Sequence, residues 1–228
     1  MDPACAERGA EFGLRPPFGF WAVGRAGAMG EVSAEVAAAA IGFMAQGRVA
    51  EFWNERAAGV SSREVAEALA VHAADFGRRV FADLDDADVA RCAELVHTVT
   101  AAGLASLGPL FAAWRTIPVP DDPAGAVTVE LQVLREMRGA AHLSAANVVG
   151  LGPHGVIMSF VADQIRGGAG GAERFGWEPP HPEPDVEARA QAEALTTAAC
   201  VPAFEALTAS ERGELVDLVL LLRSAIDM

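Results

Sequence analysis

The residues of this sequence that are best suited to chemistry lie in the run from Leu134 to His142. On an α-helix, Arg135, Arg138 and His142 are spaced by three and then four residues, so their side chains share one face. Two guanidiniums can hold a carboxylate, phosphate or sulfate, and a neighbouring imidazole can move a proton. The run therefore predicts a site for a small anionic metabolite, bound by Arg135 and Arg138. His142 or Glu136 is the expected general base, with Glu136 directed toward a different neighbour.

A second interpretation of the same run needs no ligand. The two arginines pair with acids such as Glu130 or Glu94, and His142 is a core residue with its hydrogen bonds satisfied inside the protein. Burying guanidiniums among alanines and valines costs roughly several kcal/mol unless anions compensate. Glu130 and Glu136 lie on one predicted helix and cannot both reach that face, which favours a bound anion. Gly139 costs a helix roughly 1 kcal/mol relative to alanine, and it marks the close approach of another helix or of a ligand.

Two arginine-containing turns, residues 24–30 and 113–118, each precede a long predicted helix. This faint internal repeat indicates two similar helical halves packed around a shared cleft. We expect Arg25 or Arg115 to reach that cleft from the turns, with Trp114 as part of its wall. Packing in a core is the commoner use of a tryptophan, so a purely structural role for Trp114 stays open.

Hydrophobic periodicity predicts a mainly α protein, a multi-helix bundle with almost no alternation of the strand type. Ser33, Ser61 or Ser62, and Asp122 followed by Pro123 supply helix starts. The predicted helices are 31–52, 63–81, 86–105, 123–149, 185–207 and 210–226. They organise the chain into a flexible N-terminus (1–15), a helical domain (16–165), a loop rich in glycine and proline (166–184) and C-terminal helices (185–228).

The last predicted helix carries leucine and valine on more than one face, which indicates a contact with another chain. We therefore expect a homo- or hetero-oligomer, the alternative being that all of these side chains are buried in the monomer. The residues concerned are Leu215, Leu218, Val219, Leu221 and Leu222.

Composition narrows the class of function. The chain has 228 residues, 17 basic and 31 acidic side chains and a formal net charge of -14, which argues against a protein whose main task is to bind nucleic acid and predicts no nucleic-acid partner. Neither a signal peptide nor a membrane span is recognisable, so we expect a cytoplasmic protein without a membrane partner.

We expect no cofactor and no metal. The three cysteines are far apart, and no two histidines are spaced by four residues as metal ligands on a helix would be. A metal assembled across helices stays an alternative. The glycine-rich stretch 167–171 lacks the lysine and hydroxyl residue of a phosphate-binding loop.

The motif Arg135-Glu136…Arg138-Gly139…His142, preceded by the proline-rich residues 118–123, resembles the signature of an actinobacterial family of helix-turn-helix-like proteins, most of them uncharacterised. The similarity covers roughly residues 16–225. The chain departs from the family at Met137 and Ala140, where the family has histidine and aspartate, and prolines 179–184 stand where its winged segment is expected. The resemblance implies a helical fold, an actinobacterial source and a place in specialised metabolism such as antibiotic biosynthesis.

Three functions follow as hypotheses. The first is an enzyme or enzyme subunit, a cofactor-independent lyase or transferase, that eliminates or displaces an anionic group. The second is a non-catalytic protein that binds a ligand or a partner. The third is a degenerate winged-helix transcription regulator, against which the acidity and the missing wing argue.

Overall fold

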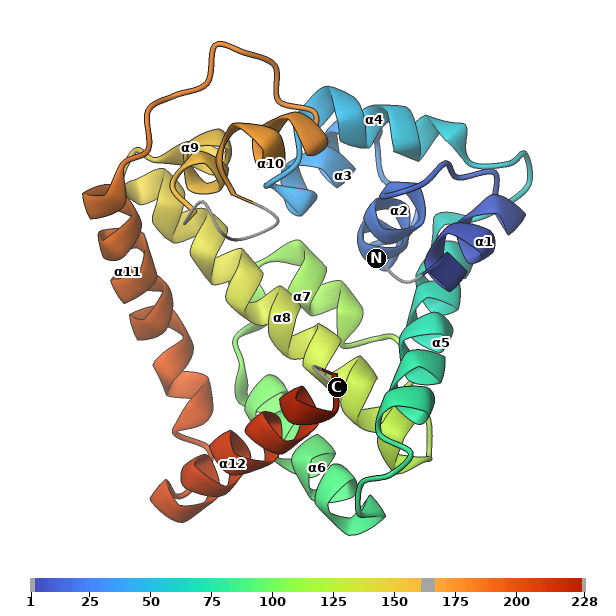
Figure 1. The fold of residues 1–228 in the computed structure, drawn as a ribbon, viewed down its shortest axis with the longest axis vertical. Helices are drawn as coiled ribbons and strands as arrows, with labels where there is room; N and C mark the ends of the chain where they lie inside the picture. The colour runs from blue at the N-terminus through green and yellow to red at the C-terminus, as the bar shows by residue number, and fades with distance from the viewer. Residues whose placement is uncertain (1–2, 161–166, 227–228) are drawn as a thin grey trace.

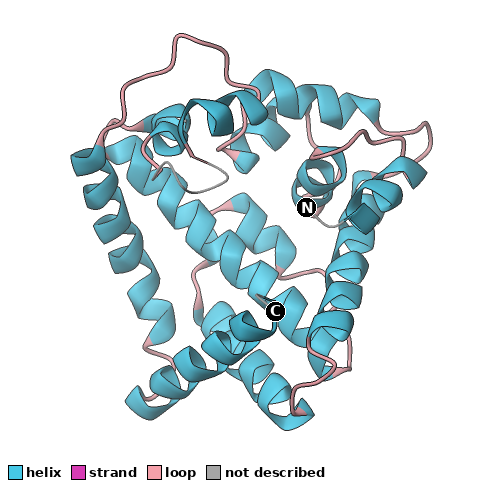
Figure 2. Cartoon of the chain, in the orientation of Figure 1, coloured by secondary structure: helices cyan, strands magenta, loops and turns pink. Residues whose placement is uncertain are grey.

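The computed structural model describes residues 3–160 and 167–226, and within them it contains helices and no strands (Figures 1 and 2). The mainly α prediction is therefore confirmed. The helices are α1 (Pro3–Glu11), α2 (Gly19–Gly27), α3 (Ala34–Ile41), α4 (Gln46–Glu55), α5 (Ser62–Val80), α6 (Asp86–Ala102), a short 3-10 helix η1 (Ala105–Leu107), α7 (Pro109–Trp114), α8 (Pro123–Val148), α9 (Gly152–Met158), α10 (Gly168–Arg174), α11 (Val186–Phe204) and α12 (Ala209–Ile226).

Helix α8 runs through the middle of the molecule, and α5, α6, α7 and α11 pack around it (Figure 1). It starts as the sequence predicts, because Asp122 accepts a hydrogen bond from the Gly125 amide and Pro123 occupies the first turn. Its buried residues, such as Val129, Val133 and Met137, belong to the main core. This central helix therefore presents different faces to several neighbours at once.

The predicted helix 31–52 is wrong in one respect, because the structure divides it into α3 and α4. Ser33 caps α3 as expected, with its hydroxyl accepting from the Val36 amide. Gly42 then adopts a φ of 77°, a left-handed conformation that ends the helix. The chain turns through residues 42–45 and α4 begins at Gln46.

The segments 24–30 and 113–118, which the sequence predicts to be turns, are partly helical in the structure. Arg25 lies inside helix α2, and Arg115 is the C-terminal cap of helix α7. These helices are nine and six residues long, too short to show a clear period in the sequence. The helix that follows α2 is broken at Gly42, whereas α8 continues for 26 residues.

The predicted flexible N-terminus (1–15) contains helix α1, and the predicted loop rich in glycine and proline (166–184) contains helix α10. The domain boundary between residues 165 and 166 lies outside the described residues. Pro202 lies inside the continuous α11.

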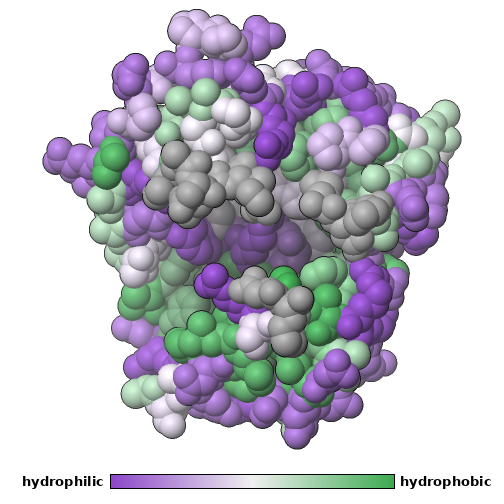
Figure 3. Space-filling view, in the orientation of Figure 1, coloured by the Kyte–Doolittle hydropathy of each residue, from purple (hydrophilic) through white to green (hydrophobic). Residues whose placement is uncertain are grey.

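Helix α12 packs on α6 through Leu215, Leu218 and Leu222. Arg91 of α6 forms ion pairs with Glu211 and Glu214 of α12. Other apolar side chains of α12 face outward, namely Val216, Val219 and Leu220. Figure 3 shows apolar surface over the lower half of this view, the region in which α12 lies. An oligomer formed through this helix remains a prediction. None of the described helices has the length and apolar character needed to cross a bilayer.

Candidate ligand-binding site

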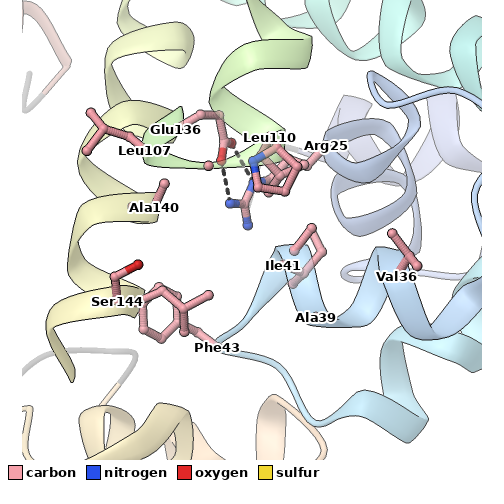
Figure 4. Close-up of a pocket in the computed structure, with 15 residues that line it drawn as sticks. Arg25, Val36, Ala39, Ile41, Phe43, Leu107, Leu110, Glu136, Ala140 and Ser144 are labelled. Carbon is pink, nitrogen blue, oxygen red and sulfur yellow. Dashed lines mark hydrogen bonds and ion pairs between the residues drawn. The ribbon is translucent and has the colours of Figure 1, made fainter. Parts of the chain in front are cut away.

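A pocket of about 280 Å³ lies between α3 and α8 (Figure 4). One face of α8 forms one wall, through residues spaced by three or four positions: Glu136, Gly139, Ala140, Leu143 and Ser144. The opposite wall comes from α3 and the turn after it: Val36, Ala39, Ala40, Ile41 and Phe43. The remaining lining residues are Arg25 of α2 and the η1–α7 segment Leu107, Gly108, Pro109 and Leu110.

The pocket exists because small side chains face one another across it. A Cβ atom added to Gly139 would meet no neighbouring atom within 4 Å. On either side of this opening the walls touch. A Cβ on Gly108 would lie 2.5 Å from the Cβ of Ala140, and one on Gly42 would lie 2.7 Å from Cδ2 of Leu143. The backbone therefore approaches α8 closely at Ala140 and at Leu143, while the space beside Gly139 stays open.

A buried ion pair lies at one end of the pocket. Arg25 donates from Nε to Oε1 of Glu136 at 2.7 Å and from Nη2 to Oε2 at 2.8 Å. Arg25 is 5% exposed and Glu136 is 1% exposed. Oε1 of Glu136 also accepts hydrogen bonds from Gln132 and Arg135. The ring of Trp21 lies 4.5 Å from the guanidinium carbon of Arg25 and 5.2 Å from that of Arg135.

This pair is charged. Burial raises the pKa of the Glu136 carboxyl, but the charge and hydrogen bonds of Arg25, together with the charge of Arg135, outweigh burial and lower the pKa below its usual value. Glu136 is therefore a carboxylate, and its charge matches that of Arg25. The geometry is bidentate, which is the strongest arrangement of these two groups.

Arg25 keeps one group available to the pocket. Its Nε and Nη2 atoms bind Glu136, whereas Nη1 makes no hydrogen bond within the described part of the chain. Figure 4 shows the guanidinium between Ala140 and Ile41, inside the pocket. The backbone of Arg25 is held by Trp114, whose Nε1 donates to the Arg25 carbonyl at 3.0 Å. The donor is therefore fixed in position from both ends.

Of the predicted site residues, Arg25, Arg135 and Glu136 meet at one end of the pocket. Arg138 and His142 lie apart from them and face α11. Arg138 is 55% exposed in its side chain and pairs with Glu193 of α11 at 2.6 Å. His142 is buried against α11, where its Nδ1 lies 2.9 Å from Oγ1 of Thr196. Arg135 is 41% exposed in its side chain and lies against Trp21 on another side of α8. The shared face predicted for these three residues is divided between two neighbours.

The carboxylates that contact the two arginines come from within the chain, as the ligand-free interpretation holds, but they are Glu136, which Arg135 shares with Arg25, and Glu193. Glu130, one of the acids proposed for this role, instead binds His97 at 2.8 Å and Thr100 at 3.1 Å. Arg138 therefore needs no bound anion, and the charge of Arg135 is partly exposed to water.

Arg115 and Trp114 contribute to the site indirectly. Arg115 donates to the carbonyl oxygens of Ala101 and Gly103 and lies over the ring of Phe111, so it closes the end of α6. Trp114 is buried and positions α2 through Arg25. The wall formed by α3 was missed by sequence reasoning. The signal that could have found it is Gly139, since the structure places a pocket beside it and no packed helix.

Helices α3 and α4, joined by the four residues 42–45 with Gly42 in the turn, have the layout of a helix-turn-helix motif. A family model described as "Helix-turn-helix family" matches residues 1–184. The chain belongs to the helix-turn-helix family. The helix-turn-helix part of the resemblance noted above is thereby confirmed. No curated protein and no solved structure matches the chain.

In this helix-turn-helix protein, the start of α4 is covered by a later segment. The Ala45 amide donates to the Phe175 carbonyl at 3.0 Å, and Trp177 Nε1 donates to the Phe43 carbonyl at 3.0 Å. A Cβ on Gly176 would lie 2.7 Å from Cβ of Arg48. Helix-turn-helix regulators read base edges with the N-terminal residues of their second helix. In this chain, residues 175–177 lie against the corresponding end of α4.

The segment covering α4 is fastened by a second group of aromatic side chains. His154 of α9 stacks on Trp177 at 4.6 Å, and its Nε2 lies 3.0 Å from Nδ1 of His181. Glu173 lies 3.7 Å from the other ring nitrogen of His181. Within the described part of the chain, no group of three or more histidine, cysteine, aspartate or glutamate side chains is arranged to hold a metal ion.

Proposed function

We propose that this helix-turn-helix family protein binds a small, mostly apolar molecule between α3 and α8. The observation that carries the proposal is the open space beside Gly139, in a pocket whose other walls are apolar and whose charged groups are already paired. Binding pockets combine apolar walls with a few fixed polar groups. Arg25, held by Glu136 and Trp114, is such a group.

Ligand binding fits the geometry better than turnover does. The two residues considered for acid–base chemistry lie apart, since Glu136 lines the pocket and His142 faces α11. Glu136 accepts four hydrogen bonds, three of them at Oε1, so this carboxylate is engaged with Arg25, Gln132 and Arg135. A general base needs to reach the proton that it removes. We therefore favour the non-catalytic reading over an enzyme acting on an anionic metabolite.

The pocket also connects a ligand to the helix-turn-helix. Helix α3 is the first helix of that motif and at the same time one wall of the pocket. A molecule between α3 and α8 contacts both walls, so it biases the position of α3 and α4 relative to the central helix. A ligand shifts such an equilibrium only by its difference in affinity for the two positions.

The pocket is tested by filling it. In Gly139→Leu the new side chain starts in open space, so the variant is expected to fold and to occupy the pocket. Gly213→Leu is the matched control, because Gly213 also lies in a helix with no atom near its added Cβ, in α12 and away from the pocket. The probes are acetophenone and cumene, followed by ligand-observed NMR. Wild type and Gly213→Leu are expected to bind at least one of them, and Gly139→Leu to lose binding at least tenfold. Equal binding by all three proteins contradicts the proposal.

A DNA-binding regulator is the second candidate, favoured by the family match and by the α3–turn–α4 layout. The formal charge of -14 and the covered start of α4 oppose it. Fluorescence anisotropy with a mixture of duplex DNA sequences at physiological salt is expected to show no binding. Sub-micromolar, sequence-dependent binding would establish the regulator in its place.

A further inference from the structure

The polar groups of the pocket leave one hydrogen-bond donor deep inside it. Among the described lining residues, the polar side chains are Arg25, Glu136 and Ser144. Ser144 is exposed, and Glu136 is a carboxylate that cannot donate and already accepts four hydrogen bonds. Nη1 of Arg25 is therefore the group with which a buried ligand can form a hydrogen bond.

The charge of Arg25 is already matched, and this decides which acceptor it can bind. Glu136 is ionised and bidentate, so Arg25 and Glu136 are neutral as a pair, and the one remaining positive charge belongs to Arg135, which also binds Oε1 of Glu136. A carboxylate or phosphate placed at Nη1 brings a second negative charge close to Glu136 in a site of low dielectric, where repulsion between like charges is strong. Arg135 contributes its charge from a side chain that is 41% exposed, where water and salt screen it.

We infer that the ligand of this pocket is an uncharged molecule with a carbonyl oxygen that accepts a hydrogen bond from Arg25 Nη1. This inference rests on the proposed function. It names ketones, aldehydes, esters or amides as the chemical class, and it replaces the anionic metabolite that the sequence favoured. The pocket volume of about 280 Å³ corresponds to roughly nine water molecules, so a compact ligand of about nine heavy atoms fits. Its apolar part lies against Ile41, Phe43 and Leu110.

Three probes of nearly the same shape separate charge from hydrogen bonding. Acetophenone presents a neutral carbonyl, benzoate presents a carboxylate, and cumene presents methyl groups in the same place. Dissociation constants for wild type and Gly139→Leu are measured by ligand-observed NMR near pH 7. Acetophenone is expected to bind wild type at least tenfold more tightly than benzoate and several-fold more tightly than cumene. The infrared carbonyl band of bound acetophenone is expected to shift to lower frequency through the hydrogen bond to Arg25.

The outcomes separate this inference from the function on which it rests. Tighter binding of benzoate, or equal binding of cumene and acetophenone, overturns the inference that the ligand is a neutral carbonyl compound. In that case, a loss of binding in Gly139→Leu still supports the pocket as the binding site. An unshifted carbonyl band overturns the hydrogen bond to Arg25. If wild type binds none of the three probes, or if Gly139→Leu binds them as wild type does, the pocket itself is not the site.

Discussion

The two halves of helix α8 use small residues in opposite ways. In its first half, α5 crosses so closely that a Cβ on Gly77 would overlap Oγ1 of Thr128 and would lie 2.5 Å from the carbonyl oxygen of Ala124. In its second half, a Cβ on Gly139 would meet nothing within 4 Å, and the space beside it is the pocket. A small residue permits two helices to meet but does not make them meet. The contacts around it decide whether the result is a tight crossing or an opening.

Ion pairs on α8 show the same contrast. Arg25 and Glu136 are both buried, at the pocket. Arg138 and Glu193 form a pair at 2.6 Å with both side chains more than a third exposed. If the exposed pair breaks, water solvates the two separated charges, whereas the buried pair has no such compensation. Breaking the buried pair therefore costs more stability than breaking the exposed pair.

The largest expected effect comes from breaking the buried pair. Glu136→Gln leaves the Arg25 charge buried without a carboxylate, and the free energy of unfolding is expected to fall by about 3–5 kcal/mol. The matched exposed variant, Glu193→Gln, is expected to lose at most about 0.5 kcal/mol. Urea unfolding monitored by circular dichroism measures both. Similar losses in the two variants would end the contrast between buried and exposed pairs.

The next largest effect tests the tight crossing. Gly77→Ala places a methyl group on Thr128 and on the α8 backbone, so α5 and α8 have to separate. Overpacking of this kind is expected to cost about 2 kcal/mol even after the gain in helix propensity. The same urea experiment applies, and an unchanged or raised stability would show that the crossing is looser than described.

Gly139→Ala sharpens the comparison with a change of opposite sign. Its methyl group enters open space, and alanine is the better helix former, so the variant is expected to gain about 0.5–1 kcal/mol in unfolding free energy. A loss of stability would mean that the wall of α3 lies nearer to α8. The same change, glycine to alanine, is thus expected to lower the free energy of unfolding at position 77 and to raise it at position 139.

The smallest effect is a pH dependence on the side of α8 that faces α11. Burial lowers the pKa of His142 below its usual value of 6.5, with the nearby Glu193 charge opposing the shift and Arg138 and Arg189 adding to it. The unfolded chain then takes up the proton more readily than the folded one. The stabilising contribution is therefore complete above pH 6.5 and declines as the pH falls below that value. Unfolding at about pH 7.5 and about pH 5.5 measures this decline, and His142→Gln is expected to reduce it. An equal decline in the variant would assign the effect to other groups.

Local sequence was enough to predict the longer helices. Ser61 caps α5, Asp85 caps α6 and Asp122 caps α8, each with a side-chain hydrogen bond to the following backbone. Caps and periodicity depend on residues a few positions apart, so the sequence shows them directly. Short helices such as α2 and α7 lack several turns over which to show a period, and packing stabilises them.

The sequence by itself determined that this protein is helical, that it is acidic and that α8 carries its densest group of polar side chains. Only the tertiary structure decided which face of α8 matters. Glu136 binds Arg25 across 111 positions of sequence, and Gly139 faces α3 instead of a closely packed helix. The physical reason is that a helix fixes the angles between its own side chains but not its rotation against its neighbours. That rotation is set by the sum of the contacts with α5, α6, α7, α9 and α11.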